Sequence, residues 1–409
     1  MLTTLLVALA AIAWLLFLSR PVLVAARMFQ IEEYERRRFL SWGIGAAWTA
    51  HRAVLVSAGV TGVALVLAAA TRIDTERTVA AGWFVASLLG ASVWRWLPPK
   101  KRLVITARMR RLLATVGLLA ALLAVGMSLL LVSGWWIAAA VLVLVPLSFT
   151  SRLAQLLLVV ADLVDAPLEA GVRRSYLRRA AERIGEWQPY AVAVAGSYGK
   201  TSTKHILAAL LQPSTVVLPT RKSFNTLMGV TRVINEDLEP SHRVFIVEMD
   251  AYAPGEIAAM CRLVHPRIAV VTSVGPQHLE RFQTLQHVED ALFEAVESLP
   301  PEGTAIVYAG DATSAAMAER ARHTGRTVLS YGISDGAARF DVEASDVLID
   351  GEGARFTWRF AARAREHEVR IPLLGRHQVL NVTAALAAVA VLDADLDAAV
   401  VAARGLQPV

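Results

Sequence analysis

Apolar residues are concentrated in the first 165 residues of this 409-residue chain. Five long apolar runs lie there, at Met1–Leu18, Ala53–Ala70, Ala81–Leu97, Leu112–Val132 and Trp135–Thr150. A helix of about 17 to 25 apolar residues can cross a bilayer. The pattern predicts a multi-pass α-helical membrane domain at residues 1–152, with about five transmembrane helices. The first run lacks a basic start and a cleavage site, so we interpret it as a retained helix rather than a signal peptide.

The loops between the apolar runs carry unequal numbers of basic residues. Loops 19–52 and 98–111 carry twelve Lys and Arg between them, whereas loops 71–80 and 133–134 carry two. The positive-inside rule places the basic loops in the cytoplasm. With five spans, we expect the chain in the cytoplasmic (inner) membrane with its N-terminus outside. Everything after Arg152 then lies in the cytoplasm, and the lipid bilayer is a predicted partner.

Two stretches beside the apolar runs have their own patterns. Phe29–Leu40 is amphipathic and basic, so we expect it to lie along the cytoplasmic membrane surface. Residues 153–188 begin apolar and then become rich in Arg and Ala, which predicts one or two linker helices. A sixth span at this junction is the alternative, and it would move the soluble half to the other side of the membrane.

Charge and cysteine content limit the partners of the chain. A net charge of +6 is compatible with nucleic-acid binding. Many of the basic residues lie in the short loops between apolar runs, however, where membrane topology accounts for them. We therefore predict no nucleic-acid partner. Cys261 is the single cysteine, so no internal disulfide forms, and no Cys/His cluster has zinc-binding spacing.

A glycine loop follows the first strand-like run of the soluble half. Tyr190–Ala195 has the pattern of a buried strand, residues 196–201 are Gly-Ser-Tyr-Gly-Lys-Thr, and helical periodicity follows. Glycines let a backbone approach phosphates, and amides at a helix N-terminus point at the anion. Lys200 would reach the β- and γ-phosphates, and the Thr201 hydroxyl would ligate Mg²⁺. The alternative is a tight turn that binds nothing, because Val194 stands where the longer phosphate-loop motif has glycine.

Polar side chains at other strand ends are candidates for the same site. Glu248 ends the apolar strand Val244–Val247, at the sheet edge where α/β proteins bind ligands, and Mg²⁺ prefers carboxylate oxygen. His278 follows the apolar run Ile268–Thr272 and its turn, so it can converge on that edge. The alternatives are a solvated acid for Glu248 and a capping or core histidine for His278.

Three further polar residues lie near expected helix starts. His377 and Asn381 are one helical turn apart and therefore share a helix face. Helix packing is the alternative explanation for both residues. Asn225 follows the second strand-like run, and its alternative is an ordinary turn residue.

These motifs, taken in order, resemble the Mur ligase family. The likeness covers residues 189–395 and is strongest to the branch that adds D-alanyl-D-alanine to a muramyl tripeptide. The matching segments are GSYGKTSTK at 196–204, SFNTLMG at 223–229, FIVEMD at 245–250 with GEI at 255–257, QHLE at 277–280, and LGRH at 374–377 with Asn381.

The resemblance implies an α/β P-loop domain with a mostly parallel sheet and a site for ATP and Mg²⁺. It implies that the metal is held by Thr201, Glu248 and His278, and that Lys200, Glu248 and His278 are catalytic. It implies nucleotide contacts from the glycine loop and from three residues outside it: Gly196, Ser197, Gly199, Lys200, Thr201, Ser202, Asn225, His377 and Asn381.

The activity that the resemblance implies is ATP-dependent amide ligation in peptidoglycan precursor synthesis. A carboxylate of a muramyl peptide, linked to UDP or to a lipid, would become an acyl phosphate, and an amine such as D-alanyl-D-alanine would displace the phosphate. Two alternatives stay open. One is a non-catalytic ATP-binding membrane scaffold that recruits cell-wall synthesis proteins, and the other is a relative such as a poly-glutamate synthase.

The sequence departs from the family pattern at three points. The family's carbamylated lysine, which helps to hold a second Mg²⁺, aligns with Leu292, and leucine cannot bind a metal. Membrane helices stand in place of the usual N-terminal UDP-sugar domain. Residues 396–409 look like the start of the family's third domain, of which we expect only a stub here.

Overall fold

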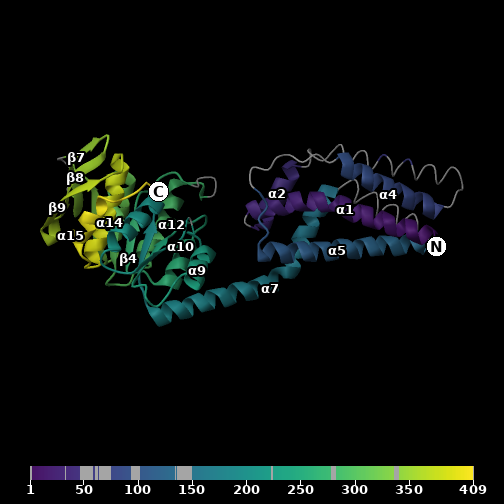
Figure 1. The fold of residues 1–409 in the computed structure, drawn as a ribbon, viewed down its shortest axis with the longest axis horizontal. Coiled ribbons are helices and arrows are strands. Elements are labelled where there is room, and N and C mark those ends of the chain that lie inside the picture. The colour runs from purple at the N-terminus through teal and green to yellow at the C-terminus, as the bar shows by residue number, and fades with distance from the viewer. Residues whose placement is uncertain are drawn as a thin grey trace. The chain divides into compact units, whose positions relative to one another are not determined.

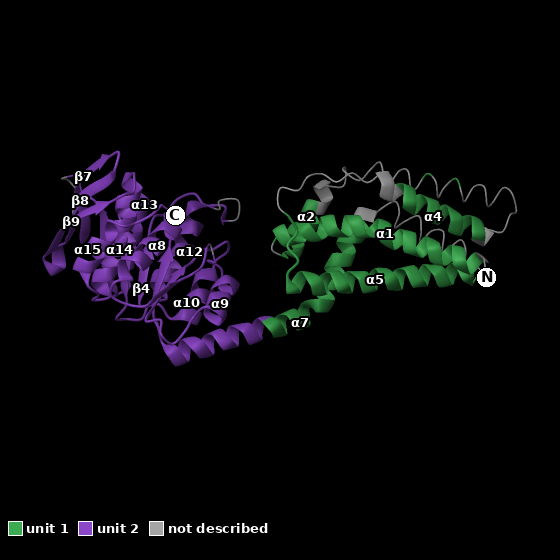
Figure 2. Cartoon of the chain, viewed as in Figure 1, with its two compact units in different colours: residues 1–172 green, residues 173–409 purple. Residues whose placement is uncertain are grey.

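The computed structural model describes residues 2–32, 34–46, 59, 63, 75–93, 102–133, 135, 150–222, 224–277, 282–335 and 340–408. The chain divides into two compact units, Met1–Val172 and Arg173–Val409 (Figure 2). The division falls inside a single helix, α7 (Thr150–Trp187), which covers the predicted linker. The linker therefore forms as one helix, and its N-terminal part belongs to the first unit.

Helices make up the described part of the first unit. They are α1 (Leu2–Ile31), α2 (Arg36–Ala46), α4 (Thr75–Val93), α5 (Ala107–Val132) and the start of α7. Among the described residues, two helices are long and apolar enough to cross a membrane, Thr3–Ile31 and Ala107–Val132. The predicted runs 53–70 and 135–150 lie almost wholly outside the described residues. Five spans therefore stay a prediction.

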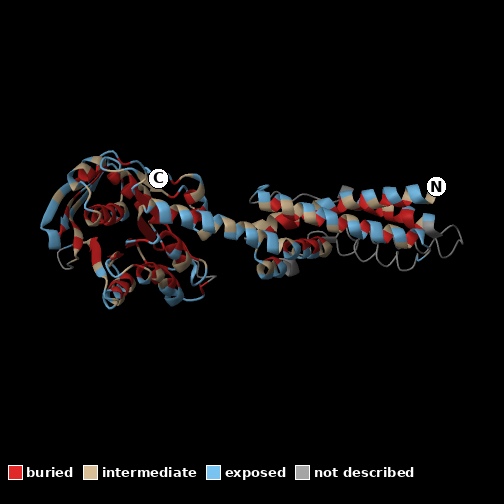
Figure 3. Cartoon of the chain, turned by 90° about the horizontal axis from the view of Figure 1, so that it is seen from below, coloured by how far each residue is buried: buried red, intermediate tan, exposed pale blue. Residues whose placement is uncertain are grey.

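The helices of the first unit have one buried and one exposed apolar face (Figure 3). Trp14, Phe17 and Trp83 form part of the buried core where α1 packs against α4. The outer face of α1 carries Leu5, Leu9, Ile12 and Leu16, which are 41–63% exposed. Their spacing of three and four residues places them on one stripe. Helices that expose such a stripe have the pattern of lipid-facing helices.

The segment Phe29–Leu40 is not one continuous surface element. α1 ends at Ile31 and α2 begins at Arg36, and between them Tyr34 adopts the left-handed conformation with φ 63°. The turn folds Phe29 and Phe39 together, with ring centroids 4.8 Å apart and both side chains fully buried. Phe29 and Phe39 are thus buried while Arg37 and Leu40 stay exposed, and a position of this segment along a membrane surface stays a prediction.

Acidic residues on α7 hold the neighbouring helices through ion pairs. Asp162, Asp165 and Glu169 are spaced by three and four residues and so lie on one helix face. Asp162 accepts hydrogen bonds from Arg36 at 2.7 Å and Arg108 at 3.1 Å, and its side chain is only 7% exposed. Two further hydrogen bonds complete the cluster: Asp165 accepts one from Thr115, and Glu169 accepts one from Arg111. The cluster fixes α2 and α5 against α7.

The second unit is built on one sheet, which Figure 1 shows with helices on both faces. Its strand order is β2-β3-β1-β4-β5-β6-β7-β8-β9. The strands are β1 (Tyr190–Ala195), β2 (Val217–Pro219), β3 (Val244–Glu248), β4 (Ile268–Val271), β5 (Thr304–Tyr308), β6 (Thr327–Ile333), β7 (Val342–Asp350), β8 (Gly353–Phe360) and β9 (Arg365–Ile371). Pairs from β2 to β7 are parallel, and β7, β8 and β9 pair antiparallel. The prediction of a mostly parallel sheet is confirmed.

Two apolar layers enclose this sheet. Val192 and Val194 of β1 point into a core formed with α8 (Lys200–Leu211), α14 (Arg376–Val391) and α15 (Leu396–Ala403). The alternate alanines of β1 point to the opposite core. The helices on that side are α9 (Leu227–Glu236), α10 (Glu256–Val264), α12 (Leu285–Glu297) and α13 (Ala312–Arg322). Burial on both faces explains the unbroken apolar sequence of β1.

Residues predicted to begin a third domain pack within this unit. Ala399, Val400, Ala403 and Leu406 are buried in the same core as α8. α15 contacts both α8 and β9. No break in packing therefore separates residues 396–408 from the sheet domain.

We expect Asp162→Ala to destabilise the first unit by about 1–2 kcal/mol, because it removes the buried carboxylate that accepts from the partly exposed Arg36 and Arg108. The measurement is the thermal unfolding midpoint of the full chain in detergent micelles, followed by tryptophan fluorescence. Glu182→Ala is the matched control on the same helix, since its pair with Arg178 is exposed and worth at most about 1 kcal/mol. Equal midpoints for the two variants would contradict the role given to Asp162.

Candidate functional site

Two glycines shape the loop between β1 and α8. Gly196 has φ 138° and Gly199 has φ 81°, both in the left-handed region that favours glycine. A Cβ atom at Gly196 would lie 2.1 Å from Thr272 Oγ1, and one at Gly199 would lie 2.7 Å from Asn381 Oδ1. The loop therefore requires glycine at both positions. It delivers the chain directly into the N-terminus of α8, where free amides can bind an anion.

Lys200 begins α8 and folds back across the loop. Its Nζ donates a hydrogen bond to the Gly196 carbonyl at 2.6 Å and to Gln277 Oε1 at 3.2 Å. The Asp250 Oδ1 atom lies 3.5 Å from the same ammonium group. The side chain is 6% exposed, so these three groups hold its charge in place within the loop. A bound phosphate would offer the ammonium group a stronger partner than the neutral carbonyl and amide oxygens.

Glu248 forms a buried ion pair with Lys204. Lys204 Nζ donates to Glu248 Oε2 at 2.9 Å, and the two side chains are 0% and 2% exposed. The other carboxylate oxygen accepts from Asn225 Nδ2 at 3.2 Å. Lys204 also donates to the Lys222 carbonyl at 2.6 Å. Both oxygens of Glu248 are thus engaged, and its charge is balanced inside the protein.

The predicted residues gather at one cleft. It is an open cleft of about 400 Å³ at the carboxyl ends of β1 and β3, and Tyr198, Asp250, Tyr252 and Gln277 contribute to its wall. The predicted residues that line it are Ser197, Gly199, Lys200, Thr201, Ser202, Asn225 and Glu248. Gly196 lines a smaller adjoining pocket. Parallel pairing explains the convergence, because Val194 of β1 lies beside Glu248 of β3.

The two predicted residues of α14 have different surroundings. Asn381 is buried at 6% exposure beside the glycine loop, and its Oδ1 accepts a hydrogen bond from Thr203 at 3.2 Å. Its Nδ2 donates to Gln378. His377 is exposed in the first turn of α14 and is not among the residues that line the cleft. Asn381 therefore braces the loop from behind, whereas a nucleotide contact of His377 stays a prediction.

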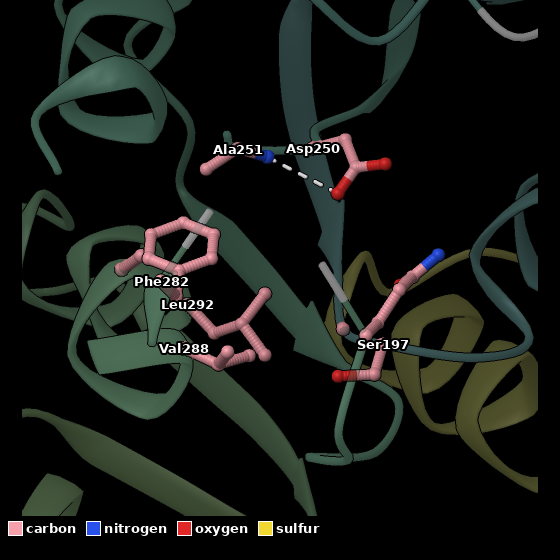
Figure 4. A pocket seen from close by; sticks show the side chains of 9 residues that line it. Ser197, Asp250, Ala251, Phe282, Val288 and Leu292 are labelled. Atoms are coloured by element: carbon pink, nitrogen blue, oxygen red, sulfur yellow. Dashed lines mark hydrogen bonds between the residues drawn. The ribbon is translucent and has the colours of Figure 1, made fainter. Parts of the chain in front are cut away.

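Two positions singled out in the sequence have other outcomes. His278 lies outside the described residues, so its metal-binding role stays a prediction. Leu292 is 4% exposed and packs in the apolar core beside Phe282 and Val288. Figure 4 shows these three side chains facing Asp250 and Ser197 across the smaller pocket. The wall where a lysine would be expected is therefore apolar.

Sequence reasoning missed three residues of this site: Lys204, Asp250 and Gln277. The signal for two of them was present. Lys204 lies four residues after Lys200 and so shares its helix face, and Asp250 lies two residues after Glu248, on the same side of an extended chain. Gln277 had no such signal, because its position depends on the irregular loop that follows β4.

The first turns of α8 carry Lys200, Lys204 and His205. Burial, followed by the charge of Lys204, lowers the pKa of His205, so this imidazole is neutral at pH 7. The oxygen atoms of Thr201, Glu248 and Asp250 line the cleft, and hard oxygen donors suit Mg²⁺. In the described part of the chain, no group of three or more His, Cys, Asp or Glu side chains forms a metal site by itself. A magnesium ion here would need phosphate oxygens and water as additional ligands, which is its ordinary preference.

We expect Lys204→Met to destabilise the second unit by about 3–5 kcal/mol, because it strands the buried Glu248 carboxylate. Chemical unfolding of the full chain measures this loss. Lys222→Met is the matched control, since the Lys222 side chain is exposed and only its backbone carbonyl contacts Lys204.

The double variant Lys204→Met with Glu248→Leu should recover most of that stability, because it removes the unpaired charge as well. A Lys204→Met variant as stable as the Lys222→Met control would show that the ion pair does not support the fold.

The second half of the chain is similar to known proteins. Residues 194–389 match the Mur ligase middle domain. The UDP-N-acetylmuramoyl-tripeptide–D-alanyl-D-alanine ligase of Synechocystis is 31% identical over 204 residues, which are 50% of this chain and 41% of that protein. MurF from Acinetobacter baumannii superposes with a TM-score of 0.53 at 29% identity, covering 58% of this chain and 50% of that one. MurF from Thermotoga maritima, in complex with ADP, superposes with a TM-score of 0.52 at 25% identity, covering 58% of this chain and 52% of that one. The chain spans about half the length of the curated relatives it matches.

Proposed function

We propose, from the premise that residues 194–389 form a Mur ligase middle domain, that this chain is the ATP-binding part of an amide ligase. The reaction is the ATP-dependent addition of D-alanyl-D-alanine, or a similar amine, to a muramyl peptide. Proteins similar to this half of the chain are named for that reaction, and one is described in complex with ADP. Because the chain spans only part of those relatives, we argue its activity from the residues of its own cleft.

One observation carries the proposal. The glycine loop, Lys200, Thr201 and two carboxylates meet in a single cleft at the carboxyl edge of a parallel sheet. α/β proteins bind nucleotides at that edge, and the N-terminus of α8 supplies amides for the phosphates. Neither a tight turn nor a solvated strand-end acid would need this convergence.

The chemistry then follows from charge. A carboxylate oxygen of the muramyl peptide attacks the γ-phosphorus of ATP, the bond to the β-phosphate oxygen breaks, and ADP leaves. The amine nitrogen next attacks the acyl carbon, inorganic phosphate leaves, and the nitrogen loses its proton to solvent. Lys200 moves from the Gly196 carbonyl to the phosphates and offsets their charge. Thr201 and the carboxylates of the cleft would hold Mg²⁺, which would supply positive charge to offset that of the phosphates.

The first unit anchors this domain to the cytoplasmic membrane. The support is the exposed apolar stripe of α1, the two helices of spanning length and the basic loops. We propose a multi-pass domain with its N-terminus outside the cell and the ATP site in the cytoplasm. An anchored ligase has direct access to lipid-linked muramyl peptides, so we favour that substrate over the soluble UDP-linked form.

A second function has an observation of its own. Leu292 makes one wall of the smaller pocket apolar, and Glu248 is already neutralised by Lys204. A domain altered in this way could bind ATP without transferring its phosphate and act as a membrane scaffold for cell-wall synthesis proteins. The two functions differ in whether substrate stimulates phosphate release.

We expect full-length protein in nanodiscs to release phosphate from ATP only when muramyl tripeptide and D-alanyl-D-alanine are both present. Lys200→Met should reduce this release by about 100-fold or more, because the transferring phosphate loses its cation. Phosphate release is measured by a coupled optical assay, with lipid-linked and UDP-linked tripeptide compared side by side.

Lys222→Met is the control, since it removes an exposed charge from the same unit. Intact ATP binding without substrate-dependent phosphate release would favour the scaffold. Phosphate release with the UDP-linked peptide alone would contradict the preference for a lipid-linked substrate.

A further inference from the structure

The loop that leads into α5 is held to the end of α1 by one glutamine side chain. Gln30 Nε2 donates a hydrogen bond to the Val104 carbonyl at 2.8 Å, and the Val104 backbone N–H donates to Gln30 Oε1 at 2.9 Å. A primary amide can donate and accept at once, so Gln30 pairs with both backbone groups of Val104. Thr106 caps α5 by accepting from the Met109 backbone at 3.1 Å. Residues 102–106, here called the α5 loop, therefore follow a fixed path.

This fixed path turns two apolar side chains outward. Leu103 packs against the core of the first unit, whereas Val104 is 60% exposed and Ile105 is 54% exposed. Removal of aliphatic surface from water is favourable, and it needs no particular geometry in the partner. The α5 loop thus offers two aliphatic side chains to any apolar phase that reaches it.

Arginines surround the exposed pair. Residues 102–111 contain four arginines and no acidic residue. Arg102 and Arg110 are exposed. Arg108 shares the Asp162 carboxylate with Arg36, yet the Arg108 side chain is still 38% exposed. Apolar side chains beside exposed arginines suit the surface of an anionic membrane, which offers acyl chains next to phosphates.

The length of α1 sets the depth of the α5 loop in a bilayer. α1 has 30 residues and is therefore about 45 Å long. A bilayer with its headgroup regions is about 40–45 Å thick. The exposed apolar stripe of α1 runs from Leu5 to Leu16, and Gln30 lies one residue before the end of the helix. When that stripe lies among acyl chains, Gln30 and the α5 loop lie at the level of the headgroups.

We propose that the α5 loop binds the headgroups of anionic phospholipids. Val104 and Ile105 enter the boundary between headgroups and acyl chains, and Arg102, Arg108 and Arg110 bind the lipid phosphates. The inference rests on the proposed membrane anchor of the first unit and adds the class of lipid that the anchor recognises. Guanidinium groups suit this role, because they bind phosphate oxygens through paired hydrogen bonds.

The single native cysteine allows a site-specific probe of the loop. Cys261 is 2% exposed, so a nitroxide reagent modifies Ile105→Cys selectively. The labelled full-length protein is placed in nanodiscs of phosphatidylcholine, with or without phosphatidylglycerol. Electron paramagnetic resonance then measures collisions of the nitroxide with lipid-soluble oxygen and with a water-soluble nickel chelate. With phosphatidylglycerol present, the label should be protected from the nickel chelate and accessible to oxygen.

Charge variants test which groups hold the loop at the membrane. Arg102→Gln with Arg110→Gln should lower the ratio of lipid-protected to water-exposed label by about 10-fold or more, because two arginines at an anionic surface are lost. Arg102→Lys with Arg110→Lys should keep most of the protection, since both charges remain. Arg404→Gln is the matched control, because it removes an exposed arginine of the second unit. Equal loss of protection in the control and in the double glutamine variant would overturn the role of the two arginines.

A second label separates this inference from the anchor on which it rests. Ile12 is 55% exposed on the apolar stripe of α1, so Ile12→Cys reports whether that stripe lies in lipid. Lipid protection at Ile12 with Ile105 in water would overturn the lipid-binding loop and leave the anchor standing. Protection at Ile105 that does not depend on phosphatidylglycerol, or protection from both reagents, would overturn anionic headgroups as its partner. An Ile12 label exposed to the nickel chelate would overturn both proposals.

Discussion

The ion pair between Lys204 and Glu248 ties the phosphate-loop helix to the strand beside it. Its two side chains are almost fully buried, 2.9 Å apart, and separated by 44 residues of sequence. Because one charge without the other would be unstable there, α8 and the end of β3 keep a fixed spacing. That spacing sets the width of the cleft between Lys200 and Asp250. The arrangement of the glycine loop and the sheet edge around the cleft depends on it.

Much of this domain could be predicted from the sequence because its signals are local. The strand, glycine loop and helix at 190–211 follow one another, and Glu248 ends an apolar run, so both were placed at the correct sheet edge. The antiparallel strands β7, β8 and β9 were not foreseen, although Phe356, Trp358 and Phe360 of β8 alternate with polar residues in the pattern of a strand. Lys204 could be placed on the helix face of Lys200 from its spacing, but its pairing with Glu248 could not, because that depends on how α8 packs against β3.

The limits of local signals also explain why His377 is exposed and Asn381 is buried. A spacing of four residues puts two side chains on one helix face but does not say how far along the helix the site reaches. α14 begins at Arg376, so His377 lies in the exposed first turn while Asn381 lies one turn deeper, against Gly199. Likewise the sequence of Phe29–Leu40 shows an amphipathic pattern, but only the fold shows that the turn at Tyr34 packs its two phenylalanines against each other.

Leu292 and Asp250 together show why a missing ligand is best judged in three dimensions. In the sequence they are 42 positions apart, and leucine alone suggests a lost metal site. In the fold they line the same small pocket on opposite sides. In this pocket α12 presents an apolar wall and the segment after β3 presents a carboxylate. Spacing along the chain does not reveal that juxtaposition, because it depends on how the helix packs against the sheet.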